Sequence, residues 1–159
     1  MADEILNITR KINNAIRSDR IKRIALNTVL SVHKPRIFEK GQAEGGSQIG
    51  NYSTKPLSIS KDRQARNTGK TYFKGGYAEY KTLIGKNPGY VNLRNTDQMQ
   101  GDYGLIQNGG SFGFGFQNSD NSKKADYNTD HFNKDIFALS NSEVDLLANV
   151  LAFELNKAI

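Results

Sequence analysis

The 159-residue sequence contains no cysteine and no tryptophan, only three prolines, and no long run of apolar residues. Without cysteine, the chain can form no disulfide and offers no thiolate for catalysis or for binding zinc. The first residues lack the apolar core of a signal peptide, and no window approaches the roughly 18 apolar residues of a membrane-spanning helix. We therefore expect a soluble protein that is made in the cytoplasm and does not enter a membrane.

Acidic residues are scarce near the start of the chain and common near its end. The net charge is +6, with a pI of about 9.5. Residues 1–36 hold 8 Lys/Arg against 3 Asp/Glu, whereas residues 120–159 hold 4 against 7. This polarity could neutralise nucleic-acid phosphates, or it could steer copies of the chain head to tail. Composition alone does not separate the two interpretations.

The first part of the chain predicts a long basic helix, residues 1–34. Apolar residues recur mostly at helical spacing from about Asp3 to Val32, and Pro35 is expected to end the helix. The apolar positions are Ile5, Ile8, Ile12, Ile16, Ile24 and Leu26. Six basic side chains are candidate contacts for DNA or an acidic partner, although a solvated helix face is the plainer interpretation. They are Arg10, Lys11, Arg17, Arg20, Lys22 and Arg23.

Residues 39–76 predict an extended arm. They are rich in Gly, Ser, Asn, Gln and Lys, and their apolar residues show no sustained period. The segment is also far longer than an ordinary connection between secondary-structure elements. Four apolar residues within it are nevertheless too many for a simple linker, and we assign them to packing or a subunit interface. They are Ile49, Tyr52, Leu57 and Ile59. We expect the arm to become ordered only against other subunits.

Residues 77–159 predict a small antiparallel sheet and a C-terminal helix. A short helix is expected over 77–84 and a helical turn over 96–100. Residues 103–107 and 111–117 then form a hairpin around Asn108-Gly109-Gly110. Period-two alternation places three aromatic rings on one face of the second strand, as further candidates for packing or a subunit interface. They are Phe112, Phe114 and Phe116.

The final segment predicts an amphipathic helix. Ser140 and Glu143 have the spacing of a capping box, and Lys157 lies in the last turn, where the helix dipole favours a positive charge. Its apolar stripe is broad enough to predict burial on more than one side, so we expect this helix to cover the aromatic face of the hairpin. The whole chain, 1–159, is then a single α+β domain.

Motifs that resemble catalytic or binding sites are incomplete. Gly69-Lys70-Thr71 lacks the earlier glycine of a phosphate-binding loop, because that position is Gln64. The segment from Asp126 to Asp130 begins like a calcium loop, yet His131 and Phe137 stand where a glycine and a glutamate are needed. We therefore expect no catalytic, cofactor or metal site, and a protein that is not an enzyme.

The order of segments resembles the virion-morphogenesis, or tail-completion, proteins of tailed bacteriophages, from about Arg36 to Leu155. The segments that carry the resemblance are 36–39, the Gly/Lys-rich arm, 75–81, 91–99, the hairpin and 135–140. Leu93, Thr96 and Met99 match one family mark, with Asp97 at its usual glycine position. A second family motif, an aromatic residue and a Leu-Ser pair before the last helix, is matched by Phe137, Leu139 and Ser140. Asp135-Ile136 stands where the family usually has an arginine-containing pair.

This resemblance implies a structural component of the virion neck that forms a ring of six or twelve identical copies around the DNA channel. The implied partners are copies of the chain, neighbouring portal, neck or tail proteins, and packaged DNA through non-specific contacts. Two alternatives remain open from the residues themselves. One is a basic nucleic-acid-binding module that uses the six basic residues above; the other is a hydrolase hidden in the polar loops, tested by replacing His33 and His131.

Overall fold

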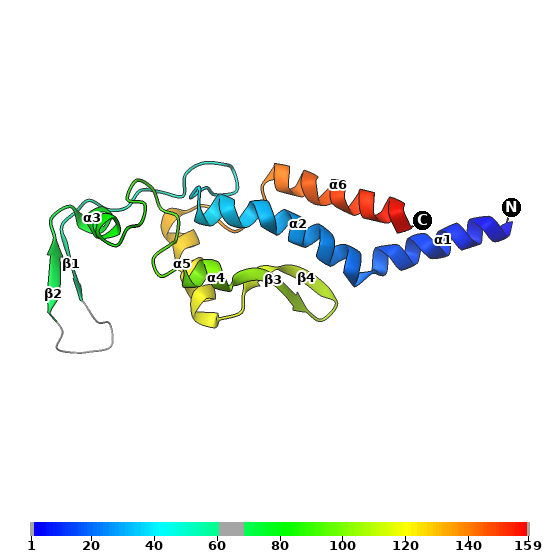
Figure 1. Cartoon of the computed structure of the whole chain (residues 1–159), viewed down its shortest axis with the longest axis horizontal. Coiled ribbons are helices and arrows are strands. Elements are labelled where there is room, and N and C mark those ends of the chain that lie inside the picture. Colours follow the sequence, from blue (N-terminus) through cyan, green and yellow to red (C-terminus); the bar gives the residue numbers. More distant parts are fainter. Residues whose placement is uncertain (1, 61–68, 159) are drawn as a thin grey trace.

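The computed structural model describes residues 2–60 and 69–158 and confirms an α+β fold. Over these residues it has six helices and two antiparallel hairpins. The molecule is elongated, with helix α1 at one end and the β1–β2 hairpin at the other (Figure 1). Most of the chain between them packs around a central helix, α2.

The predicted N-terminal helix is broken in two. Helix α1 spans Ala2–Arg17 and α2 spans Asp19–Phe38, with Ser18 in an extended conformation between them. The predicted long N-terminal helical segment is therefore present, but it is interrupted at Ser18. A reason is visible in the apolar spacing, which steps by five residues from Ile16 to the buried Ile21 and so shifts the apolar face.

Helix α2 also continues past the predicted stop at Pro35. It ends at Phe38, and Glu39 and Lys40 both donate their backbone N–H groups to the carbonyl oxygen of Pro35. Proline disfavours a helix interior because its nitrogen has no hydrogen to donate. Here Ile37 and Phe38 are fully buried, and we attribute the continued helix to the core packing that this last turn provides.

The predicted arm contains a hairpin of its own. Strands β1, Leu57–Ser60, and β2, Lys70–Phe73, pair antiparallel with Leu57 opposite Phe73. Residues 61–68 of the arm lie outside the described residues. Helix α3, Gly76–Leu83, packs against β2 and confirms the predicted short helix. The arm was thus predicted with too little regular structure, because four-residue strands give no sustained period.

The second hairpin agrees with its prediction. After α4, Gln98–Asp102, strand β3 spans Tyr103–Asn108 and β4 spans Ser111–Phe116. Asn108 lies opposite Ser111, so Gly109 and Gly110 form the two-residue turn. Helices α5, Ser119–Phe132, and α6, Asn141–Ala158, complete the chain.

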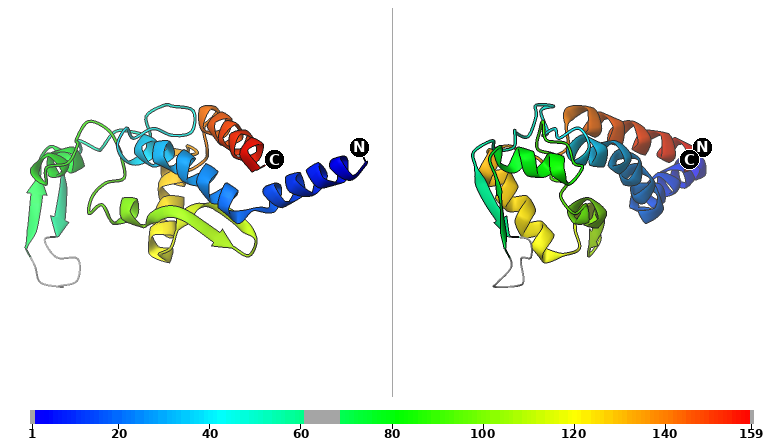
Figure 2. Two further views of the ribbon diagram at one scale, coloured as in Figure 1. Left: turned by 45° about the vertical axis from the view of Figure 1, so that its right-hand side comes forward. Right: turned by 60° about the vertical axis from the view of Figure 1, so that its left-hand side comes forward.

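Helix α2 lies between α6 on one side and the β3–β4 hairpin on the other (Figures 1 and 2). The hairpin is therefore covered mainly by α2, whereas α6 approaches it only near its turn, which corrects the prediction that α6 is the main cover. The buried core gathers at the C-terminal end of α2 and draws on residues from 37–49 and 91–136, but not on the β1–β2 hairpin or α3. Its buried members are Ile37, Phe38, Ala43, Ile49, Val91, Met99, Tyr103, Ala125 and Ile136.

Candidate functional site

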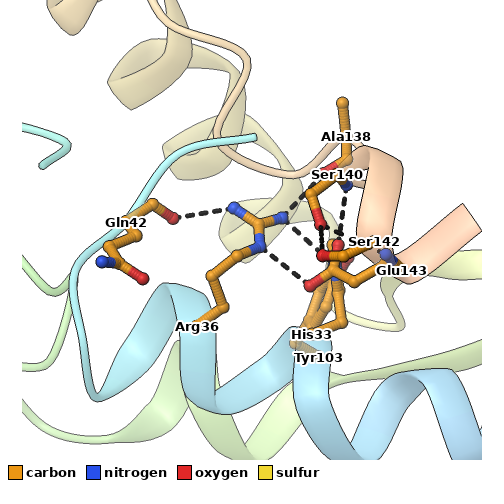
Figure 3. Close-up of polar contacts among 8 residues, drawn as sticks. All are labelled: His33, Arg36, Gln42, Tyr103, Ala138, Ser140, Ser142 and Glu143. Atoms are coloured by element: carbon orange, nitrogen blue, oxygen red, sulfur yellow. Dashed lines mark hydrogen bonds and ion pairs between the residues drawn. The ribbon is translucent and has the colours of Figure 1, made fainter. Parts of the chain in front are cut away.

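Four polar side chains meet in the interior where α2, β3 and the start of α6 converge (Figure 3). They are His33 and Arg36 from α2, Tyr103 from β3, and Glu143 from α6; we call them the polar cluster. One carboxylate oxygen of Glu143 accepts from Arg36 Nε at 2.9 Å. The other accepts from His33 Nδ1 at 3.0 Å and from the backbone N–H of Ser140 at 2.8 Å.

The predicted capping box forms, and it is part of this cluster. Ser140 Oγ accepts from the backbone N–H of Glu143 at 3.3 Å, which completes the reciprocal pair. Only 5% of the Glu143 side chain is exposed, unlike an ordinary capping glutamate. Burying a carboxylate is unfavourable unless it is paired and hydrogen-bonded, and Arg36, His33 and Ser140 supply those partners. The start of α6 is thereby fixed to α2.

Burial and hydrogen bonds set the charges in the polar cluster. Burial lowers the pKa of His33, so the imidazole is neutral at pH 7, with Nδ1–H donating to Glu143 and Nε2 accepting from the hydroxyl of Tyr103 at 2.8 Å. Burial alone raises the pKa of Glu143, but the hydrogen bonds from Arg36, His33 and Ser140 outweigh it and the net pKa is lowered. A neutral histidine therefore separates a buried carboxylate from a tyrosine hydroxyl.

The polar cluster is better suited to stabilising the fold than to catalysis. His33 is fully buried, and both of its ring nitrogens are engaged by protein groups. Arg36 also donates to the carbonyl oxygens of Gln42 and Ala138, so its guanidinium is committed to the fold (Figure 3). An open pocket of about 690 Å³ borders the cluster. Across residues 2–60 and 69–158, no group of three or more His, Asp or Glu side chains could hold a metal ion.

Helix α6 has a broad apolar stripe that the single chain covers only in part. Seven of its side chains form what we call the α6 stripe, and none of them is buried: Val144, Leu146, Leu147, Val150, Leu151, Phe153 and Leu155. Phe153 is 58% exposed and Val144 47%. The one buried residue of α6 is Glu143. The predicted burial of this helix on more than one side is therefore absent from the single chain.

The three phenylalanines of β4 have separate surroundings. Phe114 stacks on the ring of His33 with centroids 5.3 Å apart. Phe116 packs against Tyr103 and Phe137. Phe112, near the hairpin turn, instead lines an apolar groove of about 320 Å³, together with Leu26 of α2 and two leucines of the α6 stripe, Leu147 and Leu151. Within the described chain, this groove is where the hairpin, α2 and α6 share an open apolar surface.

The structure separates the six predicted basic residues. Lys11 and Arg20 line a groove of about 590 Å³ between α1, α2 and the end of α6, while Arg10 and Arg17 are exposed on α1. Arg23 packs over the ring of Phe112 and donates to the side chain of Gln107 at 2.6 Å. Lys22 lies over the same ring and is 3.5 Å from Asp19. Lys22 and Arg23 therefore have partners within the chain, which the sequence did not predict.

The four predicted packing or interface residues of the arm also differ from one another. Ile49 is 1% exposed and belongs to the core. Tyr52 donates its hydroxyl to the side-chain oxygen of Asn92 at 3.2 Å. Leu57 and Ile59 are half-buried in β1. Ile49 therefore packs in the core, as one of its two predicted roles requires. Because it is buried, it cannot contact another subunit.

Sequence reasoning missed a second buried cation, Lys81 of α3. Its ammonium donates to the carbonyl oxygen of Arg94 and lies over the rings of Tyr52 and Tyr77, at 4.9 and 5.6 Å from their centroids. Burial, with the nearby positive charge of Lys86, lowers the pKa of Lys81 to about 8. A lysine in an amphipathic eight-residue helix is ordinarily exposed, so no pattern in the sequence marked it.

Comparison of the chain with protein-family models, with curated proteins and with solved structures found no match. Among the described residues, no helix is long and apolar enough to cross a membrane.

Proposed function

We propose that this chain is a structural subunit of a tailed-phage virion, and that copies of it form a ring at the neck, or head-tail junction, around the DNA channel. The observation that carries the proposal is the α6 stripe, none of whose seven apolar side chains is fully buried by the single chain: Val144 and Phe153 are exposed, and the other five are half-buried. Apolar surface of this extent, next to an open apolar groove, is typical of an interaction site. The order of segments described above supplies the class of assembly.

The shape of the molecule supports the same proposal. Helix α1 and the β1–β2 hairpin project from opposite ends of the central body (Figure 1). Elements that extend from a body can contact neighbours, and a two-stranded hairpin is marginal in water by itself. The proposed neighbours are copies of the chain and the portal, neck or tail proteins beside them. The chain needs no cofactor in this role, and no reaction is assigned to it.

Electron microscopy of the virion tests the proposal directly. Purified particles labelled with an antibody against the chain are expected to carry the label at the neck, between head and tail. A tailless or neck-defective particle from a phage that lacks the gene serves as the control for antibody specificity. Label found only inside the capsid, or absent from the particle, contradicts the proposal.

Exposed arginines favour a second function, a nucleic-acid-binding module. Arg10, Arg17 and Arg20 are exposed on α1 and the first turn of α2, and they can neutralise phosphates. DNA affinity is then expected to fall steeply with salt, by about 0.9 log units per log unit of salt for each contact. Replacing the three arginines by glutamine should flatten this slope in a fluorescence-anisotropy titration. Absence of DNA binding at about 50 mM salt removes this second candidate.

A further inference from the structure

Helix α1 is a poorly covered element of the chain. Among its described side chains, residues 10–17, only Ala15 is buried, and Ile16 is 54% exposed. Isolated helices of about this length are marginal in water, so most of their stability has to come from packing of an apolar face. A partner for the apolar face of α1 is therefore expected outside the surface that the chain itself provides.

The chain's own α6 reaches α1 only at one end. Ala15 borders the same groove as Glu154 and Ala158, in the last turn of α6. Leu147 lies about two turns earlier in α6, beside Phe112 and Leu26 in the apolar groove. The α6 stripe thus extends well beyond the part that α1 of the same chain contacts.

The two helices match in length and in charge. Helix α1 has 16 residues and α6 has 18, about 24 and 27 Å at 1.5 Å per residue. Helix α1 ends in Arg17, and Asp145 is exposed early in α6. An antiparallel arrangement brings these opposite charges together. It also places the start of α1, acidic by sequence, near Lys157 in the last turn of α6.

We propose that α1 of one copy lies antiparallel on the α6 stripe of a neighbouring copy, with Ile16 of one chain close to Leu147 of the other. The inference rests on the proposed function and specifies the contact through which copies join. Because the two surfaces differ, the contact is heterologous and links copies head to tail, which forms a ring when the rotation between neighbouring copies closes. A contact of α6 with a second α6 leaves α1 uncovered.

Because the sequence has no native cysteine, cysteine cross-linking can report this contact without side reactions at other thiols. One full-length variant carries Ile16→Cys and a second carries Leu147→Cys; the two are mixed at increasing chain concentration and treated with a short bismaleimide linker. We expect a cross-linked product of two chains, increasing with concentration. The matched control replaces Leu147→Cys in the mixture by Leu83→Cys, since Leu83 is 73% exposed on α3 and lies outside the proposed contact. Circular dichroism verifies that each variant is folded.

The cross-linking results distinguish the proposed α1–α6 contact from the proposed function. A strong Ile16–Leu147 product and a weak Ile16–Leu83 product support the contact. Equal yields from both mixtures, or no product from either, overturn it. Oligomers that form without the Ile16–Leu147 cross-link also overturn the contact, while they leave the ring proposal intact. Conversely, a specific cross-link together with antibody label away from the neck supports the contact and overturns the proposed function.

Discussion

At the scale of single residues, Glu143 links the start of α6 to α2. Its carboxylate joins the backbone N–H of Ser140, just before α6, to two side chains of α2; the bonds with His33 and Arg36 are buried, and the bond with Ser140 is partly buried. Removing one member of a buried ion pair leaves the other charge uncompensated, which is far more unfavourable than losing an exposed pair. Glu143 therefore contributes a buried ionic link to the α2–α6 contact.

We expect Glu143→Gln to lower the free energy of unfolding by about 2 to 4 kcal/mol, because Arg36 loses its buried counter-charge. Urea denaturation followed by circular dichroism measures the change. The control is Glu154→Gln in the same helix. Its partner Lys157 is well exposed, so its effect should stay below about 1 kcal/mol. Equal effects of the two substitutions contradict the role given to Glu143.

The same cluster predicts that acid destabilises the protein from about pH 6.5 downward. The folded pKa of His33 is lowered from 6.5, so below that pH the unfolded chain binds a proton that the folded chain does not. The lowered pKa of Glu143 acts in the same direction below about pH 4.5. Denaturation at pH 7.5, 6.5, 5.5, 4.5 and 3.5 should show unfolding free energy decreasing, by at most about 1.4 kcal/mol per pH unit per group.

A His33→Gln variant separates the two groups in this pH dependence. It should show a flatter profile between pH 6.5 and the lower folded pKa of His33, while the loss below about pH 4.5 remains. An unchanged slope in the upper interval shows that His33 does not contribute.

At the scale of elements, the sequence predicted those whose signals are local. The β3–β4 hairpin has a turn with Gly109 at positive φ, and α6 has its capping box, so both were predicted from neighbouring residues alone. Helix α5 was not predicted, although Asn118 caps it through a 2.8 Å bond from the N–H of Asp120. Its face toward the protein buries only Asn121 and Ala125, which gives no apolar period.

Features that depend on distant residues could not be predicted in the same way. The burial of Glu143 depends on Arg36, 107 positions away. The choice of α2 over α6 as the cover of the hairpin depends on how three elements share one side of the molecule. Hydrophobic patterns give the face that an element buries but not the element that covers it. For this reason the apolar stripe of α6 was identified correctly and assigned to the wrong partner.

The two ends of α3 provide a prediction for this element. Gly76 and Gly85 both have positive φ, +71° and +69°. A Cβ at Gly76 lies 2.5 Å from the carbonyl oxygens of Ser53 and Lys55, whereas one at Gly85 meets nothing within 4 Å. Gly85→Ala should therefore cost about 1 kcal/mol of backbone strain, and Gly76→Ala about 2 kcal/mol more. Thermal unfolding of both variants measures the difference; equal losses contradict the packing at Gly76.

At the scale of the whole molecule, the centre is well buried and the two ends are more exposed. The polar cluster and the core lie around the C-terminal half of α2. Helix α1 and the C-terminal part of α6 extend beyond them (Figure 2). A molecule of this kind is expected to gain stability when its outer surfaces are covered, because association favours the folded state by mass action.

We therefore expect the melting temperature to increase with chain concentration. Leu147→Asn in the α6 stripe should remove this dependence, because it introduces a polar group into the apolar contact, and should lower monomer stability only modestly since Leu147 is half-buried. Leu83→Asn on α3 is the matched control and should retain it. Differential scanning calorimetry over a range of concentrations makes the measurement. A melting temperature that is independent of concentration in the unaltered protein contradicts self-association.

The separation between Arg36 and Glu143 also governs when the fold can close during synthesis. Arg36 is translated early, but its buried counter-charge lies 107 positions later, inside the last helix. The nascent chain therefore cannot complete its interior until the C-terminal segment has left the ribosome. A truncated product lacking that segment would keep Arg36 and His33 without the carboxylate of Glu143 as their partner. We expect such a product to stay incompletely folded and to be cleaved by quality-control proteases.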